Sequence, residues 1–512
     1  MKLNLPSPIR CIVAGVLLGA VTAPADPLVT SWFTANTGKY ARIYTSLANR
    51  TNGISTSTWT GQTAPTYAGV HEIDYSASWV YVKDSGLASY VMGPWNNPNL
   101  PKNQGTSTKV IRFPRTPSIP GSKTLTGMGA IGYLVDGVSI YNTSDGFSYS
   151  NTNSKDGTPN GTIGAGDGIW NRDAYPNEGG SFDAALNHPQ PSGDYHAHAD
   201  PMGVRYLLGD NVNFDSATKA YSENTNATSW KHSPIIGWAL DGIPVYGPYG
   251  YSNPTNPASG VRRMISGYVL RDGAYGTTNL GLTGRTSLPL WAQAAQGRGA
   301  LATNQYGPAT NYTSGTGPAT LTYTLGHYAE DYDYLGDLGF TQGATNTVGS
   351  YTAAFDLNKY NARYCVTPEF TNGTWAYFVT IQSNGASWYP YNVGRWYYGS
   401  PTGGNSTVAV MNADTPLTQY YKGATNLQEV LAAPAVNAAN GNVTLTWSAL
   451  EGGTYQVNVS ADVKTWTTNL ALGLTATNNT AAVVETGAAN ASAQRFYRVA
   501  RTSVAAFDAT GY

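Results

Sequence analysis

The chain has 512 residues, of which only 12% are charged, with 29 basic against 30 acidic side chains. This balance argues against a protein that binds nucleic acid or anionic lipid through a basic surface. The 58 glycines, 37 tyrosines and 13 tryptophans favour strands and turns over long amphipathic helices. The composition therefore predicts an all-β protein.

The first 25 residues have the pattern of a secretory leader. Lys2 and Arg10 give it a positive start, and Cys11–Thr22 forms its apolar core. Ala23-Pro24-Ala25 has the small-x-small pattern of a cleavage site. We therefore expect a secreted, periplasmic or cell-surface protein that begins at Asp26. No later segment reaches the about 18 consecutive apolar residues that a transmembrane helix needs.

Loss of this leader changes the charge and the cysteine content. It leaves 27 basic and 30 acidic residues, a net charge of −3. Cys11 is lost with it, so Cys365 is expected to be alone and unable to form an intramolecular disulfide. Stability is then expected to come from a large core or from bound ions.

Short runs of alternating apolar and polar residues predict strands along the chain. The clearest of these runs are Ser78–Lys83, Val110–Phe113, Ile131–Val135, Trp375–Ile381 and Val443–Trp447. Tight turns are predicted at Asp136-Gly137, Asp241-Gly242 and Asn372-Gly373. Helical patterns are weak and confined to Leu290–Gln296 and Asn358–Arg363.

A change in composition near residues 426–434 predicts a domain boundary. Tyrosine-rich sequence ends there, and Ala, Val, Thr and Asn predominate after it. The short strands from Val436 to Ala500 resemble the fibronectin type III or immunoglobulin-like sandwiches of bacterial secreted proteins. After the leader we expect an N-terminal extension over 26–69, a large sandwich-like β-rich domain over 70–425, a small β-sandwich over 434–503 and a tail over 504–512.

Four of the six histidines lie within 45 residues, at His188, His196, His198 and His232. On an extended strand alternate side chains share a face, so His196 and His198 can reach the same ion. Neutral imidazoles bind Zn, Cu, Ni and Fe, and three or four of them complete a transition-metal site. We predict His196 and His198 as a ligand pair and His188 and His232 as the third and fourth ligands. Cu and Zn are the leading ions.

Carboxylates near this pair have two possible roles. Asp194 and Asp200 flank it and could orient an imidazole, and Asp200 is also the reserve metal ligand. A separate acidic loop over residues 330–337 offers oxygen donors for Ca²⁺, although such runs are more often solvated turns. His71 and His327 are expected to be structural residues.

Several long motifs resemble those of one known family. They are Asn187–Asp194, Tyr195-His196-Ala197-His198, His232–Pro248, Cys365–Phe370 and Gly373–Thr380. With them, the segment from about Val70 to Tyr398 resembles the YHYH family of secreted proteins, named for its tyrosine and histidine alternation. Ala197 replaces the tyrosine expected between the two histidines, on the strand face opposite to them. The resemblance implies a shared histidine set and no particular reaction.

Two functions remain open from the sequence. The first is an exported metal-binding β-protein, in which an open coordination position would allow metal-activated water or redox chemistry. The alternative is a non-catalytic cell-surface or adhesion protein with structural histidines, whose C-terminal module binds a glycan or a surface protein. The chain has no GxSxG, Walker, HExxH or dinucleotide motif. The sequence therefore leaves open whether the protein is an enzyme.

Overall fold

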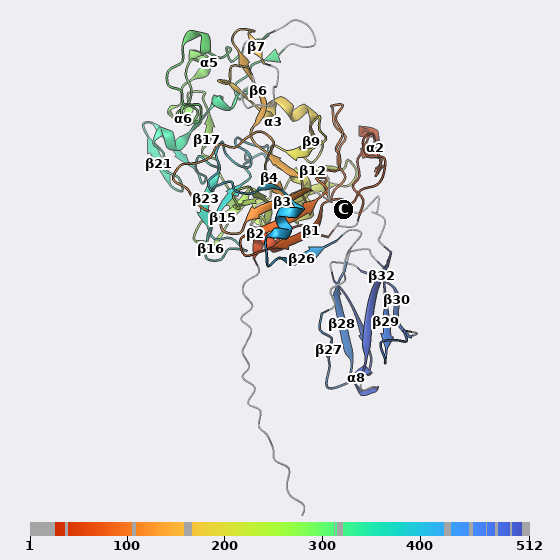
Figure 1. The fold of residues 1–512 in the computed structure, drawn as a ribbon. Helices are drawn as coiled ribbons and strands as arrows, with labels where there is room; N and C mark the ends of the chain where they lie inside the picture. Colours follow the sequence, from red (N-terminus) through yellow and green to blue (C-terminus); the bar gives the residue numbers. More distant parts are fainter. Residues whose placement is uncertain are drawn as a thin grey trace, which may run out of the picture.

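Strands predominate in the computed structural model, shown in Figure 1, which confirms the all-β prediction. It describes residues 26–35, 39–104, 109–157, 166–311, 313–314, 321–423, 432–449, 454–466, 468–476, 480–491 and 494–503. The expected leader and tail lie outside the described residues, as does most of the expected boundary near 426–434. Within the described ranges, no helix is both long and apolar enough to cross a membrane.

The central element is an eight-stranded sheet with the order β23-β24-β14-β13-β4-β5-β10-β9. Its strands are β4 (Ala130–Leu134), β5 (Ser139–Tyr141), β9 (Asn187–Pro189), β10 (Tyr195–Ala197), β13 (Ile235–Ala239), β14 (Pro244–Tyr246), β23 (Ala362–Cys365) and β24 (Thr374–Phe378). β10 pairs with β5 in parallel, as β14 does with β24, and the other neighbours are antiparallel. Connections between distant segments therefore build this sheet.

Two of the three predicted tight turns connect hairpins of this sheet, and the third ends the loop over residues 366–373 between β23 and β24. Gly137, Gly242 and Gly373 follow β4, β13 and β23 and have positive φ angles of 89°, 78° and 92°. Glycine adopts this conformation without steric cost, whereas other residues rarely do. The turn predictions are therefore confirmed.

A five-stranded antiparallel sheet shares a core with the central sheet. Its order is β25-β3-β2-β1-β26, from β1 (Val70–Tyr75), β2 (Trp79–Asp84), β3 (Lys109–Pro114), β25 (Gly404–Thr407) and β26 (Thr418–Lys422). Phe113 of β3 packs edge-on against Tyr133 of β4, with ring centroids 6.2 Å apart. Leu28 and Trp32, which precede both sheets, belong to the same apolar core.

A second core, rich in tyrosine and tryptophan, lies among smaller sheets. The remaining strands before residue 423 are β6 (Ser144–Ser150), β7 (Lys155–Asp156), β8 (Asn171–Asp173), β11 (Val212–Asp215), β12 (Ala220–Glu223), β15 (Tyr249–Asn253), β16 (Asn256–Arg263), β17 (Tyr268–Leu270), β18 (Thr313–Ser314), β19 (Leu321–Thr322), β20 (Tyr332–Tyr334), β21 (Thr345–Val348) and β22 (Tyr351–Ala354). Trp170, Tyr268, Trp291 and Tyr389 are among its buried side chains.

Helices are short throughout the described residues. The α-helices are α1 (Pro27–Thr30), α2 (Leu47–Thr51), α3 (Ala174–Glu178), α4 (Met202–Leu207), α5 (Leu280–Thr283), α6 (Leu290–Gln296), α7 (Val408–Ala413) and α8 (Ala488–Ala491). Single 3₁₀ turns are η1 (Gly179–Ser181), η2 (Ala227–Ser229), η3 (Ala274–Gly276), η4 (Thr303–Gln305), η5 (Ala329–Asp331) and η6 (Leu335–Leu338). The helix predicted at Leu290–Gln296 is present, whereas the pattern at Asn358–Arg363 forms a turn that leads into β23.

The C-terminal segment contains two three-stranded sheets with a core of their own. The sheets are β27-β28-β31 and β30-β29-β32, from β27 (Ala435–Val436), β28 (Val443–Ser448), β29 (Thr454–Ser460), β30 (Thr468–Thr475), β31 (Thr480–Glu485) and β32 (Phe496–Ser503). Trp447 of one sheet packs against Tyr455 of the other, with ring centroids 5.8 Å apart. The resemblance to fibronectin type III and immunoglobulin-like modules stays a prediction, as do the domain limits.

Cys365 lies on β23 and is fully buried, and it is the only cysteine among the described residues. Burial raises the pKa of its thiol. A buried, protonated thiol is a poor nucleophile and a poor metal ligand, so we assign Cys365 to the core.

Asp136, in the turn between β4 and β5, is expected to make the unfolding free energy depend on pH. Burial raises the pKa of this carboxyl group from 3.8 to about 6, although the backbone N–H groups of Ser89 and Val138 lower it. The stability gained from its protonation is therefore full below pH 3.8 and is lost as the pH rises through about 6. We expect the unfolding free energy to fall by about 3 kcal/mol over this window, relative to an Asp136→Asn variant. Denaturant unfolding of both proteins at several pH values measures this difference, and a constant difference would contradict it.

Candidate metal centre

Three buried histidines meet at the edge of the central sheet. His188 on β9 and His196 on β10 face each other across the antiparallel pair, and His198 directly follows β10. The Nε2 atom of His196 lies 3.0 Å from that of His188 and 3.1 Å from that of His198. All three side chains could hold one metal ion, because their ligand atoms lie within 4.8 Å of one another. The prediction that His196 and His198 share a face is thus confirmed.

A tight turn over residues 190–194 brings the two strands together. The N–H of Gln190 donates to the carbonyl of Asp194, and that of Gly193 donates to the carbonyl of Gln190. Gly193 has a φ angle of 91°, which favours glycine at this position. The turn sets the register in which His188 lies opposite His196.

Two backbone carbonyls fix the protonation of His196 and His198. Nδ1 of His196 lies 3.0 Å from the carbonyl oxygen of Asp194, and Nδ1 of His198 lies 2.7 Å from that of Asn142. A carbonyl oxygen only accepts hydrogen bonds, so each Nδ1 must carry the proton. In its neutral form each ring therefore presents the lone pair of Nε2 to the cluster.

The Ser181 hydroxyl fixes His188 in the same way. It donates its single proton to the carbonyl oxygen of Glu178 at 2.7 Å, and its oxygen lies 2.7 Å from Nδ1 of His188. The hydroxyl must then accept from this nitrogen, so Nδ1 of His188 is also protonated. All three Nε2 lone pairs consequently point into one small space.

Glu178, which the sequence analysis did not identify, completes this group. It is the last residue of α3, which lies beside β9 in Figure 1. Its Oε2 atom lies 3.2 Å from Nε2 of His198 and 3.5 Å from Nε2 of His188. The only signal in the sequence is a carboxylate ten residues before His188, a pattern too common to select it.

The four atoms have the spacing of ligands around a small cation. Successive distances from Glu178 through His188, His196 and His198 and back to Glu178 are 3.5, 3.0, 3.1 and 3.2 Å. Ligands at about 2.0–2.1 Å from a tetrahedral ion are separated by about 3.3 Å. Four of the six separations among the donor atoms are thus close to this value, and the three histidines could hold one ion.

The pKa shifts keep two of the imidazoles neutral. Burial lowers the pKa of His188 to about 4, and burial together with the two neighbouring histidines places that of His196 well below 6.5. Burial also lowers the pKa of His198, but its hydrogen bond and charge interaction with Glu178 outweigh this and raise it overall. Burial raises the pKa of Glu178, but His198 outweighs this effect and the pKa is lowered. Without a metal, one proton is thus held between His198 and Glu178.

Aromatic rings enclose the centre. The ring of Tyr141 stacks on His196 with centroids 3.9 Å apart, and Phe182 packs edge-on against His188 at 4.8 Å. The Tyr141 hydroxyl donates to the carboxylate of Asp194 at 2.8 Å. Asp194 therefore supports the centre through its carboxylate and its carbonyl group.

Ala197, which lies between His196 and His198 in the sequence, is fully buried in the main apolar core.

Asp200 and His232 lie outside this group of donors. The fully buried carboxylate of Asp200 accepts two hydrogen bonds of 2.7 Å from Arg205, which also pairs with Asp210 and Glu223. His232 packs against Tyr251, with centroids 4.6 Å apart, and its Nδ1 lies 2.7 Å from the carbonyl oxygen of Ser233. Among the described residues the structure thus brings together three of the five predicted ligands.

The other polar residues singled out in the sequence have partners within the protein. Nε2 of His71 lies 3.1 Å from the carbonyl oxygen of Tyr67, and Nε2 of His327 lies 2.9 Å from a carboxylate oxygen of Asp156. In the acidic loop over 330–337, Asp331 forms a salt bridge of 2.7 Å with Arg285. The described part of this loop contributes to no group of three metal-ligand side chains. The Ca²⁺ site there stays a prediction.

The link between Glu178 and His198 can be tested in metal-free protein. A Glu178→Gln substitution removes the carboxylate that raises the pKa of His198, so this pKa is expected to fall. An NMR titration of the imidazole resonances measures it, and the resonance of His71 serves as the internal control. An unchanged pKa of His198 would mean that the carboxylate does not contact it in solution.

Comparison with known proteins identifies one family. The family model described as YHYH protein matches residues 110–389, which is more than half of the chain. The matched region contains Glu178 and the three clustered histidines. No curated protein and no solved structure matches the chain.

Proposed function

We propose that this chain, which belongs to the YHYH family, is a metal-binding protein. The proposed ligands are His188, His196 and His198 through their Nε2 atoms, with Glu178 as the fourth. The observation that carries this proposal is the convergence of three buried Nε2 lone pairs, each fixed by a hydrogen bond at Nδ1.

Converging lone pairs are costly in a protein interior unless a cation lies between them. A buried acceptor without a partner costs about 1–3 kcal/mol. The proton held between His198 and Glu178 relieves only part of this cost, because His188 and His196 stay neutral. A divalent ion would satisfy all four donor atoms at once, and its binding would release that proton.

The chemistry of the donors limits the choice of ion. Three imidazoles and one carboxylate suit Zn²⁺ and Cu²⁺, whereas Ca²⁺ and Mg²⁺ prefer oxygen ligands alone. Cys365, the only cysteine in the described part of the chain, is in the apolar core, so this part offers no thiolate to favour Cu⁺. We propose Zn or Cu as the bound metal.

We also propose that the protein acquires this metal after export. The leader pattern over residues 1–25 supports secretion to the periplasm, the cell surface or the medium. The division into an extension, a large β-rich domain and a small C-terminal β-sandwich belongs to the same proposal. The C-terminal module would then bind a glycan or a surface protein.

Metal content provides the test. The chain from Asp26 to Tyr512, purified without a histidine tag and reconstituted with Zn or Cu, is expected to hold about one ion per molecule. A His196→Ala/His198→Ala double variant should lose this ion, because only one imidazole of the centre remains. A His232→Ala variant is the matched control and should retain it. A wild-type protein that stays empty after reconstitution would overturn the proposal.

The role of Glu178 as a ligand has a separate test. Glu178→Gln replaces a charged donor by a weaker neutral one, so the metal affinity is expected to fall by about tenfold or more. Competition with a chromophoric chelator measures this affinity. An unchanged affinity would show that only the three histidines bind the ion.

A further inference from the structure

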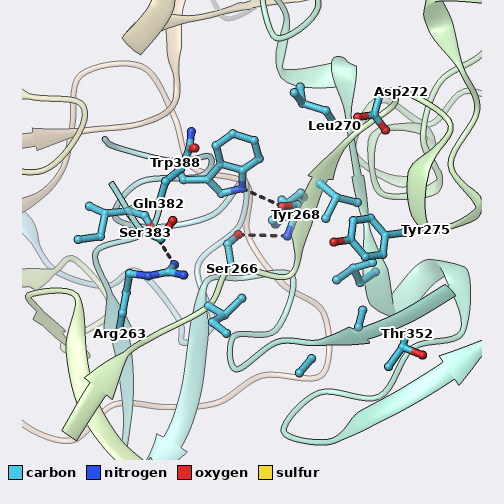
Figure 2. Close-up of a pocket in the computed structure, with 16 residues that line it drawn as sticks. Arg263, Ser266, Tyr268, Leu270, Asp272, Tyr275, Thr352, Gln382, Ser383 and Trp388 are labelled. Atoms are coloured by element: carbon cyan, nitrogen blue, oxygen red, sulfur yellow. Dashed lines mark hydrogen bonds between the residues drawn. The ribbon is translucent and has the colours of Figure 1, made fainter. Parts of the chain in front are cut away.

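A cleft away from the metal ligands lies between β16, β17, β22 and the loop after β24 (Figure 2). It has a volume of about 440 Å³. Ile265, Leu270 and Ile381 contribute apolar side chains to its lining. Thr352, Gln382 and the carboxylate of Asp272 contribute polar groups. A cavity of this size, with apolar side chains and a few polar groups in its lining, is typical of a small-molecule site.

A second cavity adjoins this cleft, and the two cavities together are called the groove below. It has a volume of about 310 Å³ and includes Trp230 in its lining. The same four side chains contribute to the lining of both cavities: Arg263, Ile265, Gln382 and Ser383. A ligand that contacts both cavities would have to be longer than a single ring.

Arg263 lies where the two cavities meet. Its Nη1 donates to the carbonyl oxygen of Ile381 at 2.6 Å, and within the described residues it forms no salt bridge. The neighbouring Arg262, in contrast, forms a salt bridge of 2.5 Å with Asp356. Burial lowers the pKa of Arg263, and the interactions with Tyr249 and Asp356, which raise it, are too weak to reverse this shift. A half-buried guanidinium with unused donors is suited to a carboxylate ligand.

Two aromatic side chains also line the cleft, and Tyr275 lies on the side opposite to Arg263 in Figure 2. The indole N–H of Trp388 donates to the carbonyl oxygen of Tyr268 at 2.9 Å, which fixes the ring in the wall. Tyr275 is 37% exposed and has a φ angle of 56°. This conformation is costly for tyrosine and persists only where the surrounding fold imposes it. Such rings offer flat apolar surfaces on which sugar rings stack.

We propose that this groove binds an acidic oligosaccharide. A uronate carboxylate would pair with Arg263, and sugar rings would lie against Trp388 and Tyr275. The hydroxyl and amide groups of Thr352, Ser383 and Gln382 would bind sugar hydroxyls. None of the proposed metal ligands lines the groove, so oligosaccharide binding there does not depend on the metal centre.

Isothermal titration calorimetry with the chain from Asp26 to Tyr512 tests the proposal. The probe is tetragalacturonate, and its fully methyl-esterified form provides the same rings without the charges. We expect the acid to bind and the ester to bind at least about tenfold more weakly, because the charged pair with Arg263 is lost. Raising the ionic strength should weaken the acid more than the ester.

Variants locate the site. Arg263→Gln should weaken tetragalacturonate binding by about tenfold or more, whereas Lys155→Gln, which removes an exposed cation that lines neither cavity, should not. Tyr275→Ala, at an exposed side chain, gives a second test if Arg263→Gln does not fold. Both groove variants should keep the metal content of the wild type.

Three results with the galacturonate probes would overturn the proposal, and a fourth comes from a peptide probe. The first three are failure of the wild type to bind tetragalacturonate, equal affinity for the acid and its ester, and unchanged affinity in a folded Arg263→Gln variant. Tighter binding of tetraglutamate than of tetragalacturonate would also overturn it, because the groove would then select an acidic peptide.

Discussion

The position of the proton on each of the three imidazole rings determines whether its Nε2 lone pair is available to bind a cation. The carbonyl oxygens of Asp194 and Asn142 hold it on Nδ1 of two rings, and the Ser181 hydroxyl holds it on the third. That hydroxyl is itself oriented by the carbonyl of Glu178, whose carboxylate faces the same three rings. The acceptors thus come from separate segments, and each leaves Nε2 free for a common partner.

The parallel pairing of β5 with β10 supplies much of this arrangement. It sets His196 opposite Ser139, and Tyr141, two residues further along β5, stacks on the imidazole of His196. Asn142 follows β5 directly, and its carbonyl reaches His198 just beyond β10. One strand register therefore provides both the ring that covers the centre and an acceptor that orients it. This is why the site belongs to the sheet and not to a surface loop.

The sequence was informative where the relation between residues is local. The two-residue period of a strand was enough to place His196 and His198 on one face. Glu178 was missed because it reaches the cluster through a short helix whose docking is tertiary. His232 and Asp200 were predicted from nearness in sequence, but aromatic packing holds the first and Arg205 binds the second. Composition alone sufficed for the all-β class, since it reflects the whole chain.

The exposure of the proposed ligands differs between the three histidines and Glu178. His188, His196 and His198 are 6%, 2% and 3% exposed, whereas the side chain of Glu178 is 25% exposed. The Oε2 atom of Glu178, which faces the histidines, is nonetheless buried, so solvent reaches other atoms of this side chain. An ion held by the four donors would therefore be enclosed by them. Release of such an ion would require the Glu178 side chain, at the end of a five-residue helix, to move. The three imidazoles would then mainly determine the affinity for the ion. The carboxylate would mainly determine the rate at which the ion exchanges with a chelator or a delivery protein.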